Sequence, residues 1–214
     1  MNRSVLILAG GESRRLGRHK ANVRVGDQTV LGRLLDSARA ARVSDLLVAV
    51  RDAETAHDWL EATGHELDDV RLVEDVRVGL GPVAGLAALG AARGAAVAVL
   101  SADLPFVTAA LIDGLLDELE TGGEDAVIPR VEGRDQWLCA AYRSGVGEVA
   151  SRLIADLDAS SSAGPSVRDL LGHLSVRRIE RVRGVAAGDL ATACRGIDTP
   201  ADLEWARSLA ARGH

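Results

Sequence analysis

The chain has 214 residues, of which 47% are hydrophobic and 26% are charged, and its formal net charge is −6. These proportions are typical of a globular domain and exclude a disordered chain, and the length fits one α/β domain. No apolar run approaches the roughly 20 residues of a membrane span, and Val5 to Ala9 is too short for a signal-peptide core. Cys139 and Cys194 match no metal-binding spacing, so we expect a protein of the reducing cytoplasm.

Apolar patterns in the first half predict alternating strands and helices. Ser4 to Ala9 is an apolar run ended by two glycines, which predicts a buried first strand. The unbroken apolar run from Ala95 to Leu100 is typical of a central parallel strand. The other elements predicted in this half are helices at 30–42, 53–63 and 82–93, and strands at 46–50 and 70–73.

The second half is less regular, but two helix starts are clear. Thr108 is predicted to cap a helix, and Thr199-Pro200-Ala201-Asp202 combines a threonine cap with an acid three residues later. The other predicted elements are strands at 126–128, 138–142 and 176–179 and a helix at 146–157. This alternation predicts one domain over residues 1–214, a Rossmann-like, doubly wound α/β/α sandwich of three layers with a mainly parallel sheet.

Charge is unevenly distributed along the chain. Residues 1–51 contain ten Lys or Arg and four Asp or Glu, a net +6, whereas the remainder carries −12. Five cations and no acid lie between Arg14 and Gly26. Such a patch on an acidic protein indicates a small anionic ligand rather than nucleic acid, although a solvated basic surface explains the charge equally well.

The number of lysines in the chain singles out one residue of this cationic patch. The chain has 24 arginines and a single lysine, Lys20, which lies within the cationic stretch. A lysine ammonium is a compact donor suited to phosphate oxygens at close range, whereas arginine presents a planar fork. The retention of one lysine in an arginine-rich chain therefore predicts a specific role for Lys20.

Two predicted loops follow strands, where open α/β sheets bind ligands. The loop from Leu8 to Lys20 combines glycines, which let backbone N–H groups approach a phosphate, with the side chains of Arg14, Arg15 and Lys20. It is not a Walker A loop, because the G-K-[S/T] sequence is missing. In the second loop, Asp103 after Ser101 would suit Mg²⁺, although a turn cap explains this acid equally well.

A glycine motif and the histidines are the alternative candidates for a binding or catalytic site. Gly79 to Ala84 satisfies the dinucleotide pattern G-x-G-x-x-A, with Asp103 about twenty residues later. However, Pro82 removes an N–H where a pyrophosphate would need one, and Asp103 follows a strand of its own. The five histidines show no metal spacing and no pairing with a nucleophile. We therefore favour a nucleotide site at the first two loops.

Seven segments in order together resemble the molybdenum cofactor guanylyltransferase family of the nucleotidyltransferase superfamily. They are L-A-G-G-E-S-R-R-L-G-R-H-K at 8–20, V-E-D at 73–75, G-P-V-A-G-L at 81–86, S-A-D-L-P-F at 101–106, G-R-D-Q-W-L at 133–138, G-P-S-V-R-D-L-L at 164–171 and I-D-T-P-A-D-L at 197–203. The first segment is a strong marker of the superfamily, and the later ones favour the guanylyltransferase branch.

The resemblance implies Mg²⁺-dependent transfer of GMP from GTP to the terminal phosphate of molybdopterin, with release of pyrophosphate. Residues from about 1 to 107 would bind the nucleotide, and residues from about 108 to 214 the acceptor. GTP and molybdopterin would be the partners, with transient contacts to molybdoenzymes or cofactor chaperones and none to nucleic acid or membranes. The acceptor phosphate is already ionised, which agrees with the lack of a catalytic base motif in the sequence.

The resemblance also assigns residues. Arg15, Lys20 and Asp103 would be catalytic, with Asp103 as the Mg²⁺ ligand and Asp198 as a second candidate ligand. The implied nucleotide-binding residues are Leu8, Ala9, Gly10, Gly11, Arg14, Arg15, Lys20, Asp75, Gly81, Pro82, Gly85 and Asp103. The implied acceptor-binding residues are Gln136, Arg168 and Asp198, and a loop at Ala159 to Gly164 is expected to close over the acceptor.

Three positions depart from the family pattern. His19 stands where the family has an acid before the lysine, Ala49 where an Asn is common, and Asp198 within a segment that replaces N-x-N-T-P. These departures leave three alternatives: a relative that uses CTP, one with a phospho-sugar or phospho-lactate acceptor, and a non-catalytic nucleotide-binding homologue.

Overall fold

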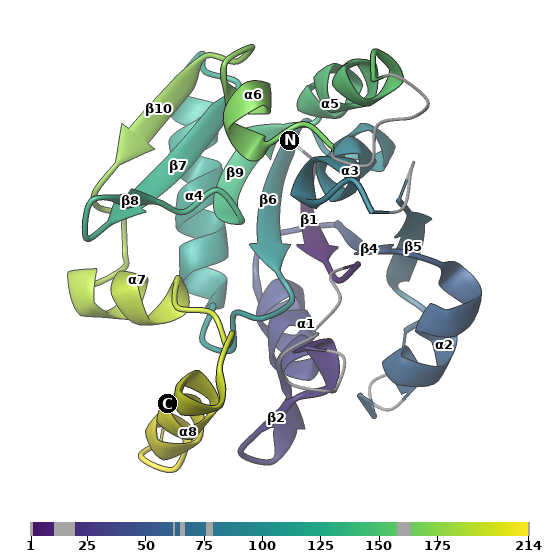
Figure 1. Ribbon diagram of the computed structural model, residues 1–214. Coiled ribbons are helices and arrows are strands. Elements are labelled where there is room, and N and C mark those ends of the chain that lie inside the picture. The colour runs from purple at the N-terminus through teal and green to yellow at the C-terminus, as the bar shows by residue number, and fades with distance from the viewer. Residues whose placement is uncertain are drawn as a thin grey trace.

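We describe a computed structural model, which covers residues 2–10, 20–61, 63–64, 67–75, 79–157 and 164–213 of the chain (Figure 1). Within these ranges, none of the helices has the length and apolar character needed to cross a membrane.

A single mixed sheet runs through both halves of the chain. Its strands are β1 (Arg3–Leu8), β4 (Asp45–Val50), β5 (Val70–Glu74), β6 (Ala96–Ser101), β7 (Ala126–Val131), β8 (Arg134–Asp135), β9 (Cys139–Arg143) and β10 (Val176–Ile179). They are ordered β10-β7-β9-β6-β1-β4-β5, and β8 pairs with β7. Strand β9 is antiparallel to both neighbours, whereas the other pairs along this path are parallel. The mainly parallel sheet is confirmed, but the sequence did not predict that β9 reverses.

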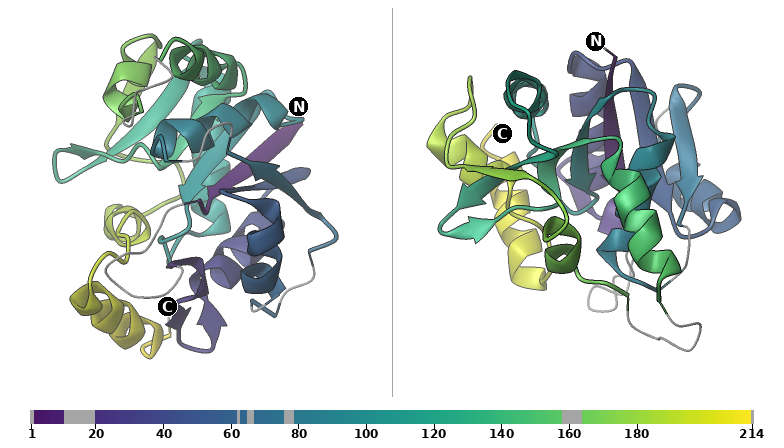
Figure 2. Two further views of the ribbon diagram at one scale, coloured as in Figure 1. Left: turned by 45° about the vertical axis from the view of Figure 1, so that its right-hand side comes forward. Right: turned by 90° about the horizontal axis from the view of Figure 1, so that it is seen from above.

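Helices cover both faces of this sheet. They are α1 (Val30–Ala40), α2 (Ala53–Glu61), α3 (Pro82–Ala87), α4 (Ala109–Thr121), α5 (Val146–Ala155), α6 (Val167–Leu171), α7 (Ala187–Ala193) and α8 (Pro200–Ala210). One hydrophobic cluster joins the sheet to α1, α2, α4, α7 and α8, and a second joins its other face to α3, α5 and α6 (Figure 2). The predicted three-layer α/β/α sandwich is therefore confirmed.

Local capping determines where α4 and α8 begin. The Thr108 hydroxyl accepts a hydrogen bond from the Leu111 N–H at 3.2 Å. At α8, the Thr199 hydroxyl accepts from the Asp202 N–H at 3.2 Å, and the Asp202 carboxylate accepts from the Thr199 N–H at 3.0 Å. Both predicted helix starts are therefore confirmed, the second as a capping box.

A small hairpin near the first helix was not predicted. It consists of β2 (Arg24–Val25) and β3 (Gln28–Thr29), joined through Gly26 at a φ of +70°. The hairpin packs against α8, where the Arg207 Nε donates to the Arg24 carbonyl at 3.3 Å. The C-terminal helix thus supports the segment that directly follows Lys20.

A buried carboxylate joins the amino-terminal ends of three parallel strands. Asp45 accepts hydrogen bonds from the Ser4 hydroxyl at 2.8 Å, from the Arg71 guanidinium at 2.9 and 3.0 Å, and from the Arg93 N–H at 2.8 Å. Burial opposes its ionisation, but the bonds from Arg93, Ser4 and Arg71 outweigh this and lower the pKa of Asp45. These bonds hold together the amino-terminal ends of the strands, which lie opposite the carboxyl ends where open α/β sheets bind ligands.

The two cysteines are distant in sequence but meet in space. Cys139 begins β9 and is buried, whereas Cys194 ends α7 and is partly buried; both thiols are free. A hydrogen bond with Cys194, together with burial, raises the pKa of the Cys139 thiol well above its ordinary value. The Cys139 thiol therefore stays protonated and is a poor nucleophile.

Candidate active site

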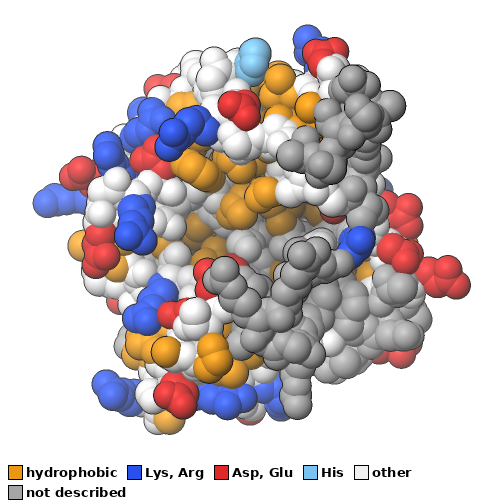
Figure 3. All heavy atoms as spheres, in the orientation of Figure 1, with side chains coloured by type: hydrophobic (Ala, Val, Ile, Leu, Met, Phe, Trp, Pro, Cys, Tyr) orange, Lys and Arg blue, Asp and Glu red, His pale blue; other side chains and the backbone are white. Residues whose placement is uncertain are grey.

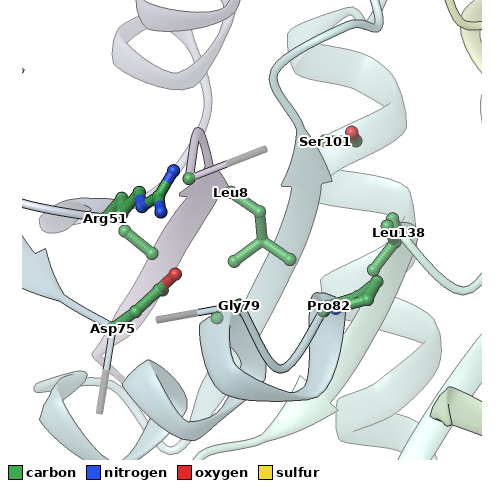
Figure 4. Close-up of a pocket in the computed structure, with 11 residues that line it drawn as sticks. Leu8, Arg51, Asp75, Gly79, Pro82, Ser101 and Leu138 are labelled. Atoms are coloured by element: carbon green, nitrogen blue, oxygen red, sulfur yellow. The ribbon is translucent and has the colours of Figure 1, made fainter. Parts of the chain in front are cut away.

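A pocket of about 370 Å³ opens at the carboxyl ends of β1, β4, β5 and β6. Figure 4 shows Leu8 near its middle, with Arg51 and Asp75 on one side and Pro82 and Leu138 on the other. The described residues that line it are Leu8, Gly10, Ala49, Arg51, Asp75, Gly79, Gly81, Pro82, Gly85, Ser101 and Leu138. The pocket therefore occupies the edge where parallel α/β sheets bind ligands.

Backbone hydrogen bonds hold the strand ends around the pocket. Leu8 pairs with Ala49 on β4, and the Ala9 N–H donates to the Ala49 carbonyl at 2.8 Å. On the other side of β1, the Leu8 carbonyl accepts from the Ala102 N–H at 3.0 Å. These bonds fix the floor of the pocket. Ala9 is only 2% exposed, so it is buried next to the floor and is not among the described residues that line the pocket.

Two glycines make room for side chains of the pocket, Gly10 for Asp75 and Gly85 for Leu8. A Cβ placed on Gly10 would lie 2.8 Å from the Asp75 Oδ2, and one on Gly85 would lie 3.1 Å from the Leu8 Cδ2. Both distances are shorter than ordinary van der Waals contacts. An alanine at Gly10 would therefore displace the carboxylate, and an alanine at Gly85 would displace the apolar floor.

The Asp75 carboxylate is the electrostatically unusual group of the pocket. Asp75 follows β5, and its N–H donates to the Val50 carbonyl at 2.8 Å. Burial raises its pKa, and the positive charge of Arg51 opposes this shift only in part. No described residue donates a hydrogen bond to this carboxylate. It is a partly buried acceptor that faces a ligand-sized space.

The segment before α3 forms the lower wall of the pocket. Gly79 and Gly81 have φ values of +88° and +74°, a region that strongly favours glycine. Pro82 then occupies the first turn of α3, where its missing N–H leaves no helical bond unmade. The predicted nucleotide-binding residues that the structure brings together here are Leu8, Gly10, Asp75, Gly81, Pro82 and Gly85.

The predicted metal ligands come from two segments that meet beyond β6. Asp103 lies two residues after Ser101, and its carbonyl accepts from the Ile197 N–H at 3.0 Å. A Cβ on Gly196 would lie 3.2 Å from the Asp103 carboxylate, so the segment that leads to Asp198 passes directly against it. Among the described residues, no three His, Cys, Asp or Glu side chains form a group that could hold a metal.

The predicted acceptor-binding residues lie on separate elements of the second half. Gln136 lies in the turn between β8 and β9, where its N–H donates to the Pro129 carbonyl at 2.8 Å. Arg168 is exposed on α6, and Asp198 is exposed between α7 and α8. Figures 1 and 2 show α6 and α8 towards opposite ends of the molecule, so one small acceptor would not contact both.

The surface of the second half combines apolar and cationic side chains. Figure 3 shows hydrophobic side chains gathered in a hollow near the middle of this face, bordered by Arg side chains over β8 and β10. Arg130 and Arg178 both lie near Asp135, with N···O distances of 3.8 and 2.8 Å, so two cations share one acid. This region retains a positive charge on an acidic protein.

Several predicted residues lie outside the described part of the chain. These are Gly11, Arg14, Arg15 and His19, and residues 159–163 of the expected closing loop. Lys20 is described only through its backbone, which begins a short 3₁₀ turn, Lys20–Asn22.

Arg51 is the charged pocket residue that the sequence did not single out. It directly follows β4, and its side chain is exposed at the pocket. The rule that ligands bind beyond the carboxyl ends of parallel strands applies to β4 as well as to β1 and β6. That rule would have identified Arg51.

Comparison with known proteins gives a consistent result. A family model described as the MobA-like NTP transferase domain matches residues 5–182. A probable molybdenum cofactor guanylyltransferase of Pelotomaculum thermopropionicum is 30% identical over 207 residues, which is 96% of this chain and 92% of the relative. One from Opitutus terrae is 38% identical over 143 residues, 64% of each chain.

Solved structures share the fold. Molybdopterin-guanine dinucleotide biosynthesis protein A of Archaeoglobus fulgidus superposes with a TM-score of 0.76 at 23% identity, covering 98% of this chain and 99% of that one. The 2-C-methyl-D-erythritol 4-phosphate cytidylyltransferase of Thermus thermophilus superposes with a TM-score of 0.66 at 23% identity, covering 99% and 100%. At these identities the likeness shows a common α/β fold.

Proposed function

Because this chain belongs to the MobA-like NTP transferase family, and is thus a nucleotidyltransferase, we propose that it transfers GMP from GTP to the terminal phosphate of molybdenum-loaded molybdopterin. The observation that carries the proposal is the pocket at the carboxyl ends of the strands, which combines an apolar floor at Leu8 with Asp75 as a hydrogen-bond acceptor. The name of the Pelotomaculum relative, which is similar over nearly its full length, supports GTP and molybdopterin as the substrates.

In this reaction, an oxygen of the acceptor phosphate forms a bond to the α-phosphorus of GTP. The bond from that phosphorus to the β-phosphate oxygen breaks, and pyrophosphate leaves with the electron pair. The acceptor phosphate is ionised near neutral pH, so no residue has to remove a proton from it. Catalysis then depends on the alignment of the two substrates and on stabilisation of the phosphate charge.

We assign the base and ribose to the pocket and the triphosphate to the cationic segment after β1. Leu8, Ala9 and Gly10 would form the nucleotide floor, and Asp75 with the segment from Gly81 to Gly85 would hold the nucleoside. Strand β1 ends at this side of the sheet at Leu8, and the cations between Gly11 and Lys20 follow it directly in the sequence, which supports their assignment to the triphosphate. Arg14, Arg15 and Lys20 would offset the phosphate charge, with Lys20 acting on the transition state.

The residues present fit a Mg²⁺ ion. Mg²⁺ takes oxygen ligands, and protein sites commonly supply one or two carboxylates while substrate phosphates and water complete the coordination. Asp103, with Asp198 on the segment packed against it, would provide such a donor set. When bound, the ion would supply charge stabilisation for the phosphate oxygens. Asp103 would orient the triphosphate with respect to the acceptor.

We assign the acceptor to the second half of the chain. The hollow beside β8 and β10 offers apolar contacts for a pterin ring system and positive charge for its anionic groups (Figure 3). Gln136 lies nearest this region along the chain, and only one of Arg168 and Asp198 would contact the acceptor, because α6 and α8 lie towards opposite ends of the molecule.

The test is pyrophosphate release with molybdate-loaded molybdopterin, Mg²⁺ and each of GTP, CTP, ATP and UTP in turn. Release with GTP alone is expected. Release with CTP alone would move the protein to the cytidylyltransferases and overturn the proposal. No release with any nucleotide, together with clear GTP binding, would overturn the proposed acceptor, and phospho-sugars and phospho-lactate would then be tried in its place.

A further inference from the structure

The polar side of the pocket is formed by two side chains of opposite charge from neighbouring strands. Arg51 follows β4 and Asp75 follows β5, which are parallel and adjacent, so both residues leave the sheet at the same edge. Their charges interact, because Arg51 lowers the pKa of Asp75 against the effect of burial. Figure 4 shows both on one side of Leu8, across the pocket from Pro82 and Leu138.

The fold gains little from keeping Asp75 charged. Burial raises the pKa of Asp75, which means that its ionised form is unfavourable in this environment, and no described residue donates a hydrogen bond to it. A glycine is also needed at position 10 to make space for its carboxylate. An acid kept at such a cost in a pocket indicates that a ligand supplies the missing donors.

The two groups present complementary edges to a base. An ionised carboxylate only accepts hydrogen bonds and can accept two in parallel, whereas a guanidinium only donates and donates two in parallel. Guanine has two acceptors, O6 and N7, on one edge, and arginine pairs with both of them. Its N1–H and exocyclic amino group form an adjacent donor edge. Adenine would present its amino group where arginine needs an acceptor, and pyrimidines have no N7.

We infer that Arg51 reads the O6 and N7 atoms of the guanine base of the nucleotide, while Asp75 accepts from its N1–H and amino group. The inference rests on the proposed use of GTP and adds a specificity-determining residue to it. A pocket of about 370 Å³ is large enough for this arrangement, since small-ligand pockets start at roughly 300 Å³. Leu8 and Leu138 would contact the faces of the base, and such apolar contacts do not distinguish guanine from the other bases.

The test compares GTP with 7-deaza-GTP, which lacks only the N7 acceptor, by isothermal titration calorimetry in the presence of Mg²⁺ and without acceptor. The variants are Arg51→Gln and Arg51→Lys, and Arg152→Gln on α5 is the control because its side chain is 74% exposed and is not among the described residues that line the pocket. Circular dichroism and thermal unfolding check that each variant is folded, and Arg51→Lys, which keeps the charge, serves if Arg51→Gln does not fold.

The wild type and Arg152→Gln should bind GTP about tenfold more tightly than 7-deaza-GTP, because a bidentate arginine contact discriminates by roughly that factor or more. Arg51→Gln should weaken GTP binding by a similar or larger factor and bring the ratio of the two affinities close to one. Arg51→Lys should also lower this ratio, since an ammonium cannot make both bonds at once.

Two outcomes would overturn the inference and leave the proposed function standing. If Arg51→Gln weakens GTP and 7-deaza-GTP equally, Arg51 acts on the phosphates, and the protein remains a GTP-binding protein. If Arg51→Gln leaves both affinities unchanged, another residue reads N7. If the wild type instead binds CTP or ATP as tightly as GTP, the use of GTP itself fails, and the inference fails with it.

Discussion

Substitution of Asp45 tests the interactions that stabilise the sheet, independently of the reaction at the pocket. The substitution Asp45→Asn keeps the shape of a side chain that is only 6% exposed but removes its charge. The amide then turns a donor towards the other donors, so the bonds from Arg71, Ser4 and Arg93 cannot all be kept. We expect a loss of stability, with no effect on the pocket at the opposite edge.

The size of the loss follows from burial. Breaking a buried charge pair costs about 3–5 kcal/mol, and hydrogen bonds to charged groups are worth about 1.5–3 kcal/mol each. The Arg71 side chain is 33% exposed and can be rehydrated, so we expect the lower end, about 3 kcal/mol. With a urea dependence of roughly 2–3 kcal/mol per molar, the unfolding midpoint should fall by about 1 M.

The stability difference between the wild type and Asp45→Asn should change with pH in a defined direction. Because the pKa of Asp45 is lowered in the folded protein, its stabilisation is fully present above the unfolded value, roughly 3.9, and is lost as pH falls through the folded value. The difference between wild type and Asp45→Asn in urea unfolding should therefore be constant from pH 7 to about 5 and shrink below about pH 4.

Asp69→Asn is the matched control. It also breaks an aspartate–arginine pair, with Arg39 at 2.6 Å, but the Asp69 side chain is 54% exposed. We expect a change of at most ~0.5 kcal/mol. Equal losses for the two variants, or a difference for Asp45→Asn that grows as pH falls, would refute the assignment of stability to the buried carboxylate. Unchanged GTP affinity in both variants would confirm that this edge is separate from the site.

Three further predictions concern the site. Asp103→Asn should abolish Mg²⁺-dependent pyrophosphate release and leave thermal unfolding unchanged; near-normal turnover would exclude Asp103 as the metal ligand. Lys20→Arg should lower kcat at least about tenfold despite the conserved charge, because the fork cannot replace a point donor at close range; a normal rate would show that Lys20 serves only as a charge. Asp75→Asn should raise the melting temperature of the ligand-free protein, since burial opposes the charged form, and should weaken GTP binding in calorimetry. In the wild type, GTP affinity should fall as pH drops through the raised pKa of Asp75, and a pH-independent affinity would contradict its role as an acceptor.

The sequence predicted those parts of the fold that local chemistry determines. The threonine caps at Thr108 and Thr199 were correct because capping involves only four consecutive residues. The apolar run from Ala95 to Leu100 was recognised as a strand because its pattern is also local, and it corresponds to β6 (Ala96–Ser101). Strand direction was not recognised, since the pairing of β9 with β6 depends on chain segments that are about forty residues apart. The hairpin at 24–29 was missed because its strands have only two residues each, although Gly26-Asp27 is a turn signal.

Part of the candidate pocket could be identified from the sequence. Leu8, Gly10, Asp75, Gly81 and Gly85, which the resemblance assigns to nucleotide binding, all line the pocket, and their contact with a nucleotide stays a prediction. Arg51 directly follows the predicted strand at 46–50, but it was missed because its place beside the pocket depends on the pairing of β4 with β1 and β5.

The tight fit of the Asp75 carboxylate against Gly10 links two positions that are distant in the sequence. A side chain larger than glycine at position 10 is acceptable only when the carboxylate is gone, and the carboxylate is useful only while the pocket receives a base with matching donors. A lineage that changes its nucleotide therefore passes through intermediates that bind neither base well unless several positions change together. Such epistasis would keep base choice constant along a branch of the family while the acceptor half diverges freely.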